Sequence, residues 1–305
     1  MKNAPPLRDD CFAMPRGVSW TPVEEALEKL HKSLENILNS STVRVNDSCG
    51  RVLAEDVLAI TSHPPFANSA VDGYGFTIST LITDNEIALE LSVGRSAAGK
   101  PFIGKVLEGY GLRLLTGAKI PEGVDTVILD EDVNKIENTI YFNAGLKKYA
   151  NIRAEGEDIL AGSIVLKKGT KLCPADLGVL ASTGIKSVEV YDQLKVAILT
   201  TGDELVEIGN ISENSQIVDA NRPMLKAQIE KWGYIPLDYG IVADDEALIE
   251  ATLNEAANSA DIILTTGGAS AGDEDHISRL LLQKANLQTW RIALKPGRPL
   301  ALALW

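Results

Sequence analysis

The sequence predicts an α/β multidomain protein, and three regional patterns support this fold class. From Gln193 onward, short apolar runs alternate with amphipathic helical stretches, which indicates βαβ units and a parallel sheet covered on both faces. Between about Gly75 and Asn151 the chain consists of short β-like segments with frequent glycines, which is typical of a mainly-β domain. The segments on either side of this insert predict a discontinuous N-terminal α+β domain.

The first part of the chain contains the clearest isolated helix signal, from Thr21 to Leu38. Thr21 can cap this helix, Pro22 suits its first turn, and apolar residues recur at helical spacing. That stripe consists of Ala26, Leu27, Leu30, Leu34, Ile37 and Leu38. The strand-like run RVLAEDVLAI follows and leads into the polar loop HPPFANSAVDGYGF. We expect residues 1–60 to share one domain with residues 150–190.

The insert, residues 61–149, is expected to be a compact β-rich domain. Its clearest strand signals are IALELSVGRSAAGK, GYGLRLLTGAKIP, VDTVILDEDV and NTIYFN. After the insert, NIRAEGEDILAGSIVLKKGT returns to loop and strand, and a helix is predicted from about Pro174 to Ser182. These later segments would complete the discontinuous domain.

The last part, residues 191–305, is expected to form the parallel sheet domain. Its apolar runs are LKVAILTT, IPLDYGIV, DIILTT and LQTWRIAL, and helices are predicted at RPMLKAQIEKWG, DDEALIEATLNEAANS and DEDHISRLLLQK. Ligands of such sheets bind beyond the carboxyl ends of the strands. The chain stops within the apolar run PLALALW, and a free end inside a buried strand would leave an unpaired edge. We therefore expect the sequence to stop short of its natural end.

Composition excludes several classes of protein. Of 305 residues, 45% are hydrophobic and 23% charged, as in ordinary soluble globular domains. The formal net charge of -13 argues against a protein that binds nucleic acid or an anionic membrane. No run approaches membrane-spanning length and the start has no signal-peptide core, which predicts a cytoplasmic protein. The widely spaced Cys11, Cys49 and Cys173 are expected to be buried or idle thiols in a reducing compartment.

The stretch DIILTTGGASAGDEDH has the order of a strand, a small-residue loop and a helix start. Glycines let backbone N–H groups close around an anion, and a helix N-terminus favours negative charge there. The candidate anion-binding residues are Thr266, Gly267, Gly268 and Ser270. The acidic residues that follow, Asp273 to Asp275, suit a hard cation such as Mg²⁺. A plain strand-to-helix turn is the alternative interpretation.

The stretch LTTGDELVEIG repeats this arrangement one βαβ unit earlier. Thr200, Thr201 and Gly202 end a predicted strand, and the acidic residues Asp203 and Glu204 follow directly. Two parallel strands that end in TTG would place both loops at one edge of the sheet. Turn composition alone could explain the residues, but the pairing of the two loops favours a binding site.

Two further stretches of this domain carry candidate residues. In VDANRPML, Asn221 could cap the helix that follows, and Asp219 could face the ligand. In LKPGRPLA, Lys295 and Arg298 flank a Pro-Gly turn and would suit an oxyanion or a phosphate. A solvated surface turn is the alternative for the second stretch.

The inserted domain contributes two polar loops. Asp72 lies in HPPFANSAVDGYGF and Thr116 in LLTGAKIPEGVDTVI, and turn chemistry accounts for most of the residue types in both. The three histidines have no metal-ligand spacing, so no zinc site is predicted.

Taken together, seven collinear stretches resemble the molybdopterin molybdenumtransferase family, which includes bacterial MoeA proteins and the C-terminal domain of gephyrin. They are PPFANSAVDGYGF, LTGAKIPEGVDTVI, NIRAEGEDI, TTGDEL, DANRPML, TTGGASAGDEDH and KPGRP. The resemblance spans most of the chain and implies a molybdopterin-binding type of α/β domain. It also implies a cytoplasmic, Mg²⁺-assisted transferase of molybdenum cofactor biosynthesis. Such an enzyme takes molybdate and adenylylated molybdopterin as substrates and releases AMP.

The resemblance also assigns roles to individual residues. Asp72, Thr116, Glu204 and Asp275 would be catalytic, with Glu204 and Asp275 associated with Mg²⁺. Lys295 and Arg298 would bind molybdate or phosphate, and Asp219 and the two TTG loops would bind substrate. The family forms homodimers in which one subunit's loops meet the other's sheet domain. Family members also continue into a small C-terminal β domain that this chain lacks, so the chain by itself is expected to be weakly active or inactive.

Two alternatives from other functional classes stay open. The first is a non-catalytic molybdopterin-binding module or a gephyrin-like scaffold. The second is another nucleotide-dependent α/β enzyme. The six residues Asp72, Thr116, Glu204, Asp275, Lys295 and Arg298 favour catalysis, because a scaffold has no need of them. The sequence does not distinguish molybdate from tungstate.

Overall fold

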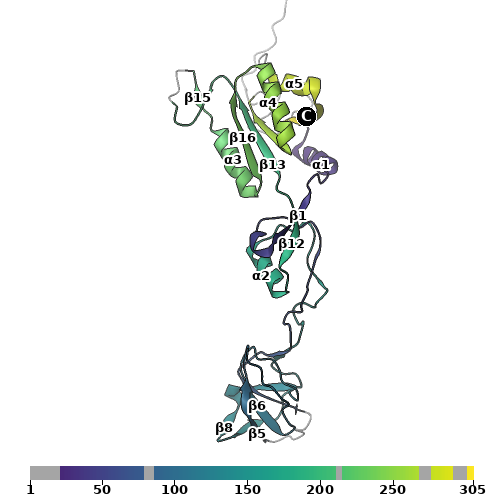
Figure 1. Ribbon diagram of the computed structural model, residues 1–305, viewed down its shortest axis with the longest axis vertical. Helices are drawn as coiled ribbons and strands as arrows, with labels where there is room; N and C mark the ends of the chain where they lie inside the picture. The colour runs from purple at the N-terminus through teal and green to yellow at the C-terminus, as the bar shows by residue number, and fades with distance from the viewer. Residues whose placement is uncertain (1–20, 79–85, 211–214, 268–275, 291–300) are drawn as a thin grey trace, which may run out of the picture. The chain divides into compact units, whose positions relative to one another are not determined.

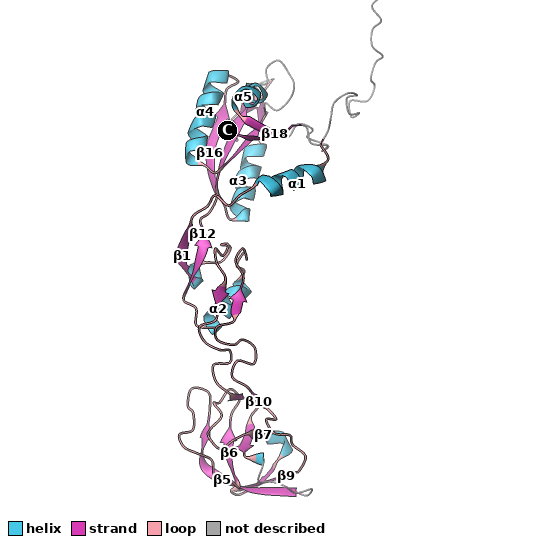
Figure 2. Ribbon diagram, turned by 90° about the vertical axis from the view of Figure 1, so that its right-hand side faces the viewer, coloured by secondary structure: helices cyan, strands magenta, loops and turns pink. Residues whose placement is uncertain are grey.

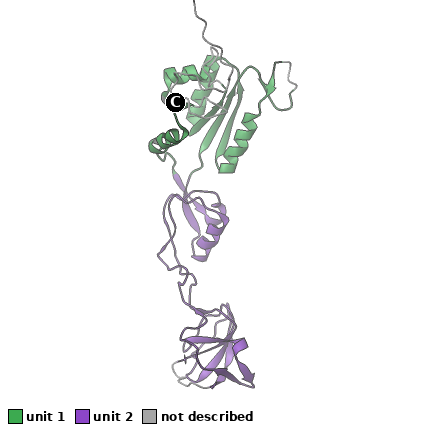
Figure 3. Cartoon of the chain, turned by 180° about the vertical axis from the view of Figure 1, so that it is seen from behind, with its two compact units in different colours: residues 1–39, 192–305 green, residues 40–191 purple. Residues whose placement is uncertain are grey.

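The computed structural model describes residues 21–78, 86–210, 215–267, 276–290 and 301–305 (Figure 1). The chain divides into two compact units, drawn in different colours in Figure 3. Unit 1 comprises residues 1–39 and 192–305, and unit 2 comprises residues 40–191. Each unit has its own hydrophobic cores and is described separately. The domain limits expected from the sequence stay predictions.

Unit 2 contains a small core that brings together segments from before and after the β-rich insert. Strand β1 (Ser40–Arg44) pairs antiparallel with β12 (Ser187–Tyr191), and β2 (Val57–Leu58) pairs with β11 (Ile164–Leu166). Helix α2 covers Pro174–Ser182, as predicted, and its Leu180 is fully buried. The core residues are Val45, Leu53, Val57, Leu172, Leu180, Ile185, Val188 and Val190.

The strand predicted at RVLAEDVLAI is only partly formed. Val52 and Leu53 make isolated bridges to Lys171 and Val190, and regular pairing returns only at β2. The run therefore packs through Leu53 and Val57 without forming one continuous strand, because its bridging partners come from separate segments.

The rest of unit 2 is the mainly-β domain that the sequence predicts. Its strands are β4 (Gly73–Phe76), β5 (Glu86–Ser96), β6 (Tyr110–Leu114), β7 (Thr126–Leu129), β8 (Asn134–Ile136) and β9 (Thr139–Asn143). They form one six-stranded sheet in the order β7-β4-β6-β5-β9-β8, in which only β5 and β6 are parallel. Two apolar clusters pack within this domain, one around Phe76 and Phe142 and the other around Leu112 and Leu114. Short strands β3 (Asn68–Ser69) and β10 (Ile152–Arg153) pair with each other.

Helix α1 spans Val23–Ser33, so it is shorter than the predicted Thr21–Leu38. The helix begins after Pro22, and no side chain caps it. Leu34 is extended, and the side chain of Asn36 accepts the N–H of Leu38, a local bond that competes with helix formation. Leu34 and Ile37 are exposed, so the second half of the apolar stripe gains no burial that would favour a longer helix.

Unit 1 is built on a three-stranded parallel sheet in the order β16-β13-β17. These strands are β13 (Lys195–Thr201), β16 (Ile235–Val242) and β17 (Ile262–Thr266). The helices of the unit's α/β part are α3 (Asn221–Trp232), α4 (Glu246–Ser259) and α5 (His276–Lys284). Figures 1 and 2 show α3 and α4 on opposite sides of the strands.

Alternating side chains of β13 supply both faces of this sheet. Val196 and Ile198 pack with Ile229 of α3, while Leu199 packs with residues of α4 and α5 such as Ile249 and Leu280. Because successive side chains of a strand point to opposite faces, an uninterrupted apolar run is the pattern of a strand buried on both sides. The predicted doubly covered parallel sheet is therefore confirmed.

The run LQTWRIAL, unlike the other apolar runs of unit 1, contributes its strand to an antiparallel pair. Its strand, β18 (Asn286–Trp290), pairs antiparallel with β19 (Ala301–Leu304), the last strand of the chain. Within the described residues these two strands form a separate sheet and do not join the parallel one. A parallel pair, β14 (Leu205–Val206) and β15 (Ile217–Val218), follows β13.

Among the described residues, no helix has the length and apolar character needed to cross a membrane. Cys49 and Cys173 are both exposed free thiols. Of the expectation of buried or idle thiols, burial is therefore wrong for these two, and idleness stays a prediction. Cys11 lies outside the described residues.

Candidate functional site

The two TTG turns of unit 1 lie at one edge of the parallel sheet. Strands β13 and β17 are neighbours, and Thr200 is in register with Thr266. Both strands end in glycines with positive φ angles, 147° at Gly202 and 86° at Gly267. A Cβ atom at Gly267 would lie 2.2 Å from the carbonyl oxygen of Thr201, so only glycine allows the turns to approach this closely.

Three buried hydroxyl groups mark this edge of the sheet. The Oγ1 atoms of Thr200, Thr201 and Thr266 are shielded from solvent and have no hydrogen-bond partner in the part of the chain that the structure describes. Buried polar groups normally have a partner, so these hydroxyls indicate a place where a ligand or water binds. Strand alternation puts Thr200 and Thr266 on the face that α3 covers, together with Ile198 and Leu264.

Glu204 lies in the turn after β13, and its carboxylate folds back over Gly202. A Cβ atom at Gly202 would be 2.5 Å from Glu204 Oε2. The carboxylate is exposed and receives no hydrogen bond from the described residues. A carboxylate without protein partners at a strand end fits a ligand for a hard cation such as Mg²⁺. No cluster of three metal-ligating side chains occurs within the described ranges.

The structure adds Asp244 to this edge, an acidic residue that the sequence reasoning did not select, and bonds it to Asp203, which follows the first TTG turn. Asp244 N–H donates to Asp203 Oδ1 at 3.0 Å, and Asp203 N–H donates to Asp244 Oδ2 at 3.3 Å. These reciprocal bonds join the turn after β13 to the turn after β16. The acidic pair DD at the carboxyl end of the IPLDYGIV strand was the signal that could have revealed Asp244.

Asp219 is buried and accepts hydrogen bonds from the first turn of α3. Its Oδ1 receives the N–H groups of Asn221, at 3.0 Å, and Arg222, at 3.1 Å. Asp219 therefore satisfies the first N–H groups of the helix from the position before the N-cap residue Ala220, while Asn221 is the first helical residue and not its cap. Its Oδ2 lies 3.4 Å from Arg222 Nε, and Arg222 also pairs with Glu207 and Asp238. Burial alone lowers the Arg222 pKa, but the contacts with Asp238 and Glu207 outweigh it and raise the pKa above its ordinary value.

Asp72 and Thr116, which belong to unit 2, are hydrogen-bonded to each other. Thr116 donates to Asp72 Oδ1 twice, from its backbone N at 2.6 Å and from Oγ1 at 2.7 Å. Both residues are exposed, and Asp72 Oδ2 accepts no hydrogen bond from the described residues. The backbone bond, then the hydroxyl bond, and to a smaller extent the charge of Arg113 hold the Asp72 pKa below its ordinary value. This arrangement presents an ionised carboxylate with one oxygen available to a ligand.

Five of the predicted site residues lie outside the described residues. They are Gly268, Ser270, Asp275, Lys295 and Arg298. Their roles stay predictions, as do the roles of Asp72, Thr116, Thr201, Gly202, Glu204, Asp219, Thr266 and Gly267. The structure brings together Thr201, Gly202, Glu204, Thr266 and Gly267 at the sheet edge, and separately the pair formed by Asp72 and Thr116. Asp219 lies at the start of α3.

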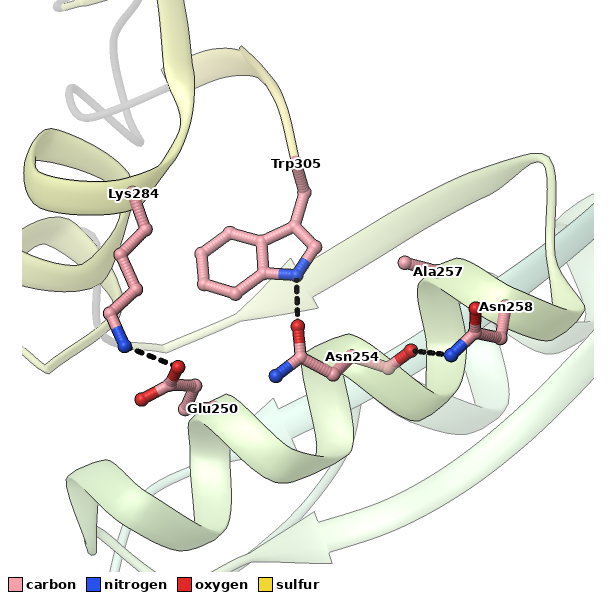
Figure 4. Close-up of a pocket in the computed structure, with 6 residues that line it drawn as sticks. All are labelled: Glu250, Asn254, Ala257, Asn258, Lys284 and Trp305. Carbon is pink, nitrogen blue, oxygen red and sulfur yellow. Dashed lines mark hydrogen bonds and ion pairs between the residues drawn. The ribbon is translucent and has the colours of Figure 1, made fainter.

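A pocket of about 440 Å³ lies elsewhere in unit 1, between α4, α5 and the last residue of the chain (Figure 4). Trp305 Nε1 donates to Asn254 Oδ1 at 3.0 Å, and Lys284 pairs with Glu250. None of the predicted site residues lines this pocket.

Comparison with protein families gives matches over both units. Residues 21–184 match the model described as the MoeA N-terminal region (domain I and II). Residues 197–305 match the model described as a probable molybdopterin binding domain.

Individual proteins show the same similarity. The chain is 39% identical over 281 residues to a molybdopterin molybdenumtransferase of Haemophilus influenzae, covering 92% of this chain and 69% of that protein. It is 30% identical to the molybdopterin molybdenumtransferase of a Staphylococcus aureus strain, covering 90% of this chain and 66% of that protein. Among solved structures, a MoeA protein of Pyrococcus horikoshii matches with a TM-score of 0.82 and 34% identity, over 93% of this chain and 72% of that one. The chain thus spans about two thirds of the length of the curated relatives.

Proposed function

The chain belongs to the MoeA family of molybdopterin molybdenumtransferases, and we propose from this that it is the main part of an enzyme of molybdenum cofactor biosynthesis. The substrates would be molybdate and adenylylated molybdopterin, and the products would be molybdenum bound to the pterin dithiolene and AMP. The observation that carries the proposal is the edge of the parallel sheet in unit 1. There, two packed TTG turns, the Glu204 carboxylate and three buried hydroxyls that have no hydrogen-bond partner among the described residues lie at strand ends, inside the segment that matches a molybdopterin binding domain.

The chemistry of the reaction fits these residues. Cleavage of a phosphoric anhydride between anionic groups needs positioning and charge neutralisation more than covalent catalysis. The hydroxyls of Thr200, Thr201 and Thr266 would donate hydrogen bonds to the substrate, and glycine permits the backbone to approach it closely. Glu204 and Asp275 would hold Mg²⁺, which would neutralise charge on the phosphate oxygens. Lys295 and Arg298 would bind the molybdate or phosphate oxyanion.

We also propose that Asp72 and Thr116 contact the substrate in the same reaction. The ionised Asp72 has one oxygen free of protein hydrogen bonds in the described structure, so it can accept from a substrate group or orient a cation. We also propose that the protein is a cytoplasmic homodimer, as the family resemblance implies. Its mass in solution, measured by light scattering, tests the dimer.

The test of the enzymatic function is the release of AMP. The protein, produced at the full length that its gene encodes, is mixed with adenylylated molybdopterin and Mg²⁺, and AMP is measured before and after molybdate is added. We expect AMP release that depends on molybdate. Tight binding without turnover would refute the enzyme and support a molybdopterin-binding scaffold, and equal release without molybdate would indicate a different nucleotide-dependent enzyme.

A further inference from the structure

Arg113, on β6, makes a three-way contact beside the Asp72 loop. Its Nη1 lies 2.7 Å from Asp130 Oδ1, and its Nη2 donates to Asp130 Oδ2 at 3.0 Å, which is a bidentate ion pair. Nη1 also lies 3.4 Å from the carbonyl oxygen of Gly73. The guanidinium carbon stands 4.9 Å from the centre of the Tyr74 ring, a cation–π distance.

These contacts join the strand ends that carry Asp72 and Thr116. Strand β4 begins directly after Asp72 and lies between β6 and β7. Thr116 follows the end of β6, and Asp130 follows the end of β7, where its N–H donates to the Asp72 carbonyl oxygen at 3.0 Å. Arg113, itself on β6, therefore contacts the start of β4 through Gly73 and Tyr74 and the end of β7 through Asp130.

The backbone beside Asp72 packs so closely against β7 that only glycine fits at position 73. A Cβ atom at Gly73 would lie 1.8 Å from the carbonyl oxygen of Ile128 on β7. The position of Asp72 is thus set by how β4 is held between its neighbours, and Arg113 is the charged side chain that spans them. The Asp72–Thr116 bonds, at 2.6 and 2.7 Å, require that the two loops stay in register.

The ion pair is too exposed to contribute much to stability. The side chains of Arg113 and Asp130 are 27% and 43% exposed, and solvent screening leaves pairs of this kind with a small contribution to stability. The bidentate ion pair still fixes the orientation of the Arg113 guanidinium relative to the Asp130 carboxylate, because two N–H groups must face two carboxylate oxygens at once. The buried Tyr74 supplies the surface on which the guanidinium rests, and burial raises the pKa of its phenol, so that it stays neutral.

We propose that Arg113 is a positioning residue for the Asp72–Thr116 pair. By contacting Gly73, Tyr74 and Asp130, its guanidinium keeps Asp72 Oδ1 within hydrogen-bond distance of the Thr116 N–H and hydroxyl groups. Asp72 Oδ2 is then left available to a ligand. This inference rests on the proposed function only in taking the Asp72 carboxylate to act on the substrate. The charged and titratable groups around this site are Arg113, Asp130, Tyr74 and Arg95, the residue in register with Arg113 on β5.

The first measurement needs no substrate. The Thr116 amide and the Asp72 carboxyl carbon are followed by NMR across acidic pH in the parent, in Arg113→Gln and in Arg113→Lys. In the parent, the Thr116 amide shift should titrate together with Asp72. In both variants we expect this coupled titration to shrink, because neither side chain can form the bidentate fork that holds the loops in register. The Asp72 pKa should rise in both variants, because the Thr116 hydrogen bonds are the main cause of its lowering, and it should rise further in Arg113→Gln, which also removes the positive charge.

The second measurement is the rate of AMP release. We expect both Arg113 variants to lower kcat by about tenfold to a hundredfold, the size of effect that misplaced catalytic groups produce, with a smaller change in KM. The control is Lys105→Gln, which removes a positive charge from an exposed ion pair with Glu122 in the same unit. This control should leave both measurements unchanged.

Three outcomes would overturn the proposal. They are a parent-like Thr116 titration in both Arg113 variants, full recovery of rate and coupling in Arg113→Lys, or equal losses in Lys105→Gln. If Arg113→Gln does not fold, Asp130→Asn removes the charged partner of the fork and should weaken the same coupling. An unchanged coupling in Asp130→Asn also counts against the proposal. If the parent releases no AMP, the proposed function fails while the NMR measurement still tests the positioning role.

Discussion

The neighbours of Asp72 set both the orientation and the pKa of its carboxylate. Thr116 donates both a backbone and a hydroxyl hydrogen bond to the same oxygen, and hydrogen bonds to a carboxylate favour its charged form. Asp72 is exposed, so the main effect of these bonds is to orient its carboxylate and to keep it ionised. Glu204 represents the opposite case, since its carboxylate has no hydrogen bond from the described residues and is available to a ligand.

Replacement of Thr116 by Val is expected to raise the Asp72 pKa part of the way to its ordinary value. The hydroxyl bond is lost and the stronger backbone bond remains. Because the folded-state pKa is lowered, the stability that Asp72 contributes is present above the unfolded-state pKa and is lost as the pH falls through the folded-state pKa. In the variant this contribution becomes smaller, and the acid limb of kcat/KM moves to higher pH. A carboxyl NMR titration checks the shift, and an unmoved pKa would contradict it.

Replacement of Glu204 by Gln is expected to lower AMP release by about a hundredfold at unchanged stability. The side chain is exposed and has no hydrogen bond from the described residues, so the fold does not depend on its charge. The matched control is Glu230→Gln, an exposed residue of α3. Turnover is compared at saturating molybdate, and thermal unfolding verifies the fold. A rate equal to the parent's would remove Glu204 from the site.

The edge of the parallel sheet depends on how its elements end. Strands β13 and β17 stop at glycines whose positive φ angles redirect the chain, and the turns then touch each other through Thr201 and Gly267. The Asp203–Asp244 bonds attach the turn after β16 to the same edge. Helix α3 begins with its N–H groups bonded to Asp219, which fixes where the positive end of its dipole lies.

Replacement of Gly267 by Ala is expected to lower the free energy of unfolding of unit 1 by more than about 2 kcal/mol. The new methyl group would meet the Thr201 carbonyl oxygen at 2.2 Å, and the residue would keep a φ of 86°. Gly209→Ala is the matched control, because its φ of 88° is close to that of Gly267 but a Cβ atom there would meet no described residue within 4 Å apart from its chain neighbours. That control should cost only about 1 kcal/mol. Urea unfolding of both variants distinguishes the two costs, and equal costs would refute the steric explanation.

The two units have separate hydrophobic cores. The clusters around Leu53, Phe76 and Leu112 contain only residues from 40–191, and those around Leu199 and Ile198 contain only residues from 192–305. A unit with its own core can fold as a domain. The first and last strands of unit 2, β1 and β12, also pair with each other. Ser40 lies opposite Tyr191 at one end of this pair, and Arg44 lies opposite Ser187 at the other.

Residues 40–191, produced as a fragment, are therefore expected to unfold cooperatively. Circular dichroism melting and the dispersion of amide NMR signals check this. A fragment of residues 40–149 serves as the control, because it lacks Leu172, Leu180, Ile185, Val188 and Val190, which fill the core around Leu53. This shorter fragment should lose the cooperative transition of that core. A 40–191 fragment without a cooperative transition would show that its cores depend on unit 1.

The sequence alone determined the fold class, the family and the parts of the site that depend on local pattern. The period of apolar residues predicted β13, β16, β17 and their helices, and the paired TTG turns predicted a common sheet edge. These features were accessible because strand periodicity, helix periodicity and turn chemistry each depend on residues a few positions apart.

Only the tertiary structure decided the contacts between distant segments. Asp72 and Thr116 are 44 residues apart, and Asp203 and Asp244 are 41 apart, so no local pattern could pair them. The sequence pattern also did not reveal three further features. These are the early end of α1, the antiparallel pairing of β18 with β19, and the bidentate ion pair of Arg113 with Asp130. The reason is physical: each depends on which surfaces are buried and which strands become neighbours, and that is settled when the whole chain packs.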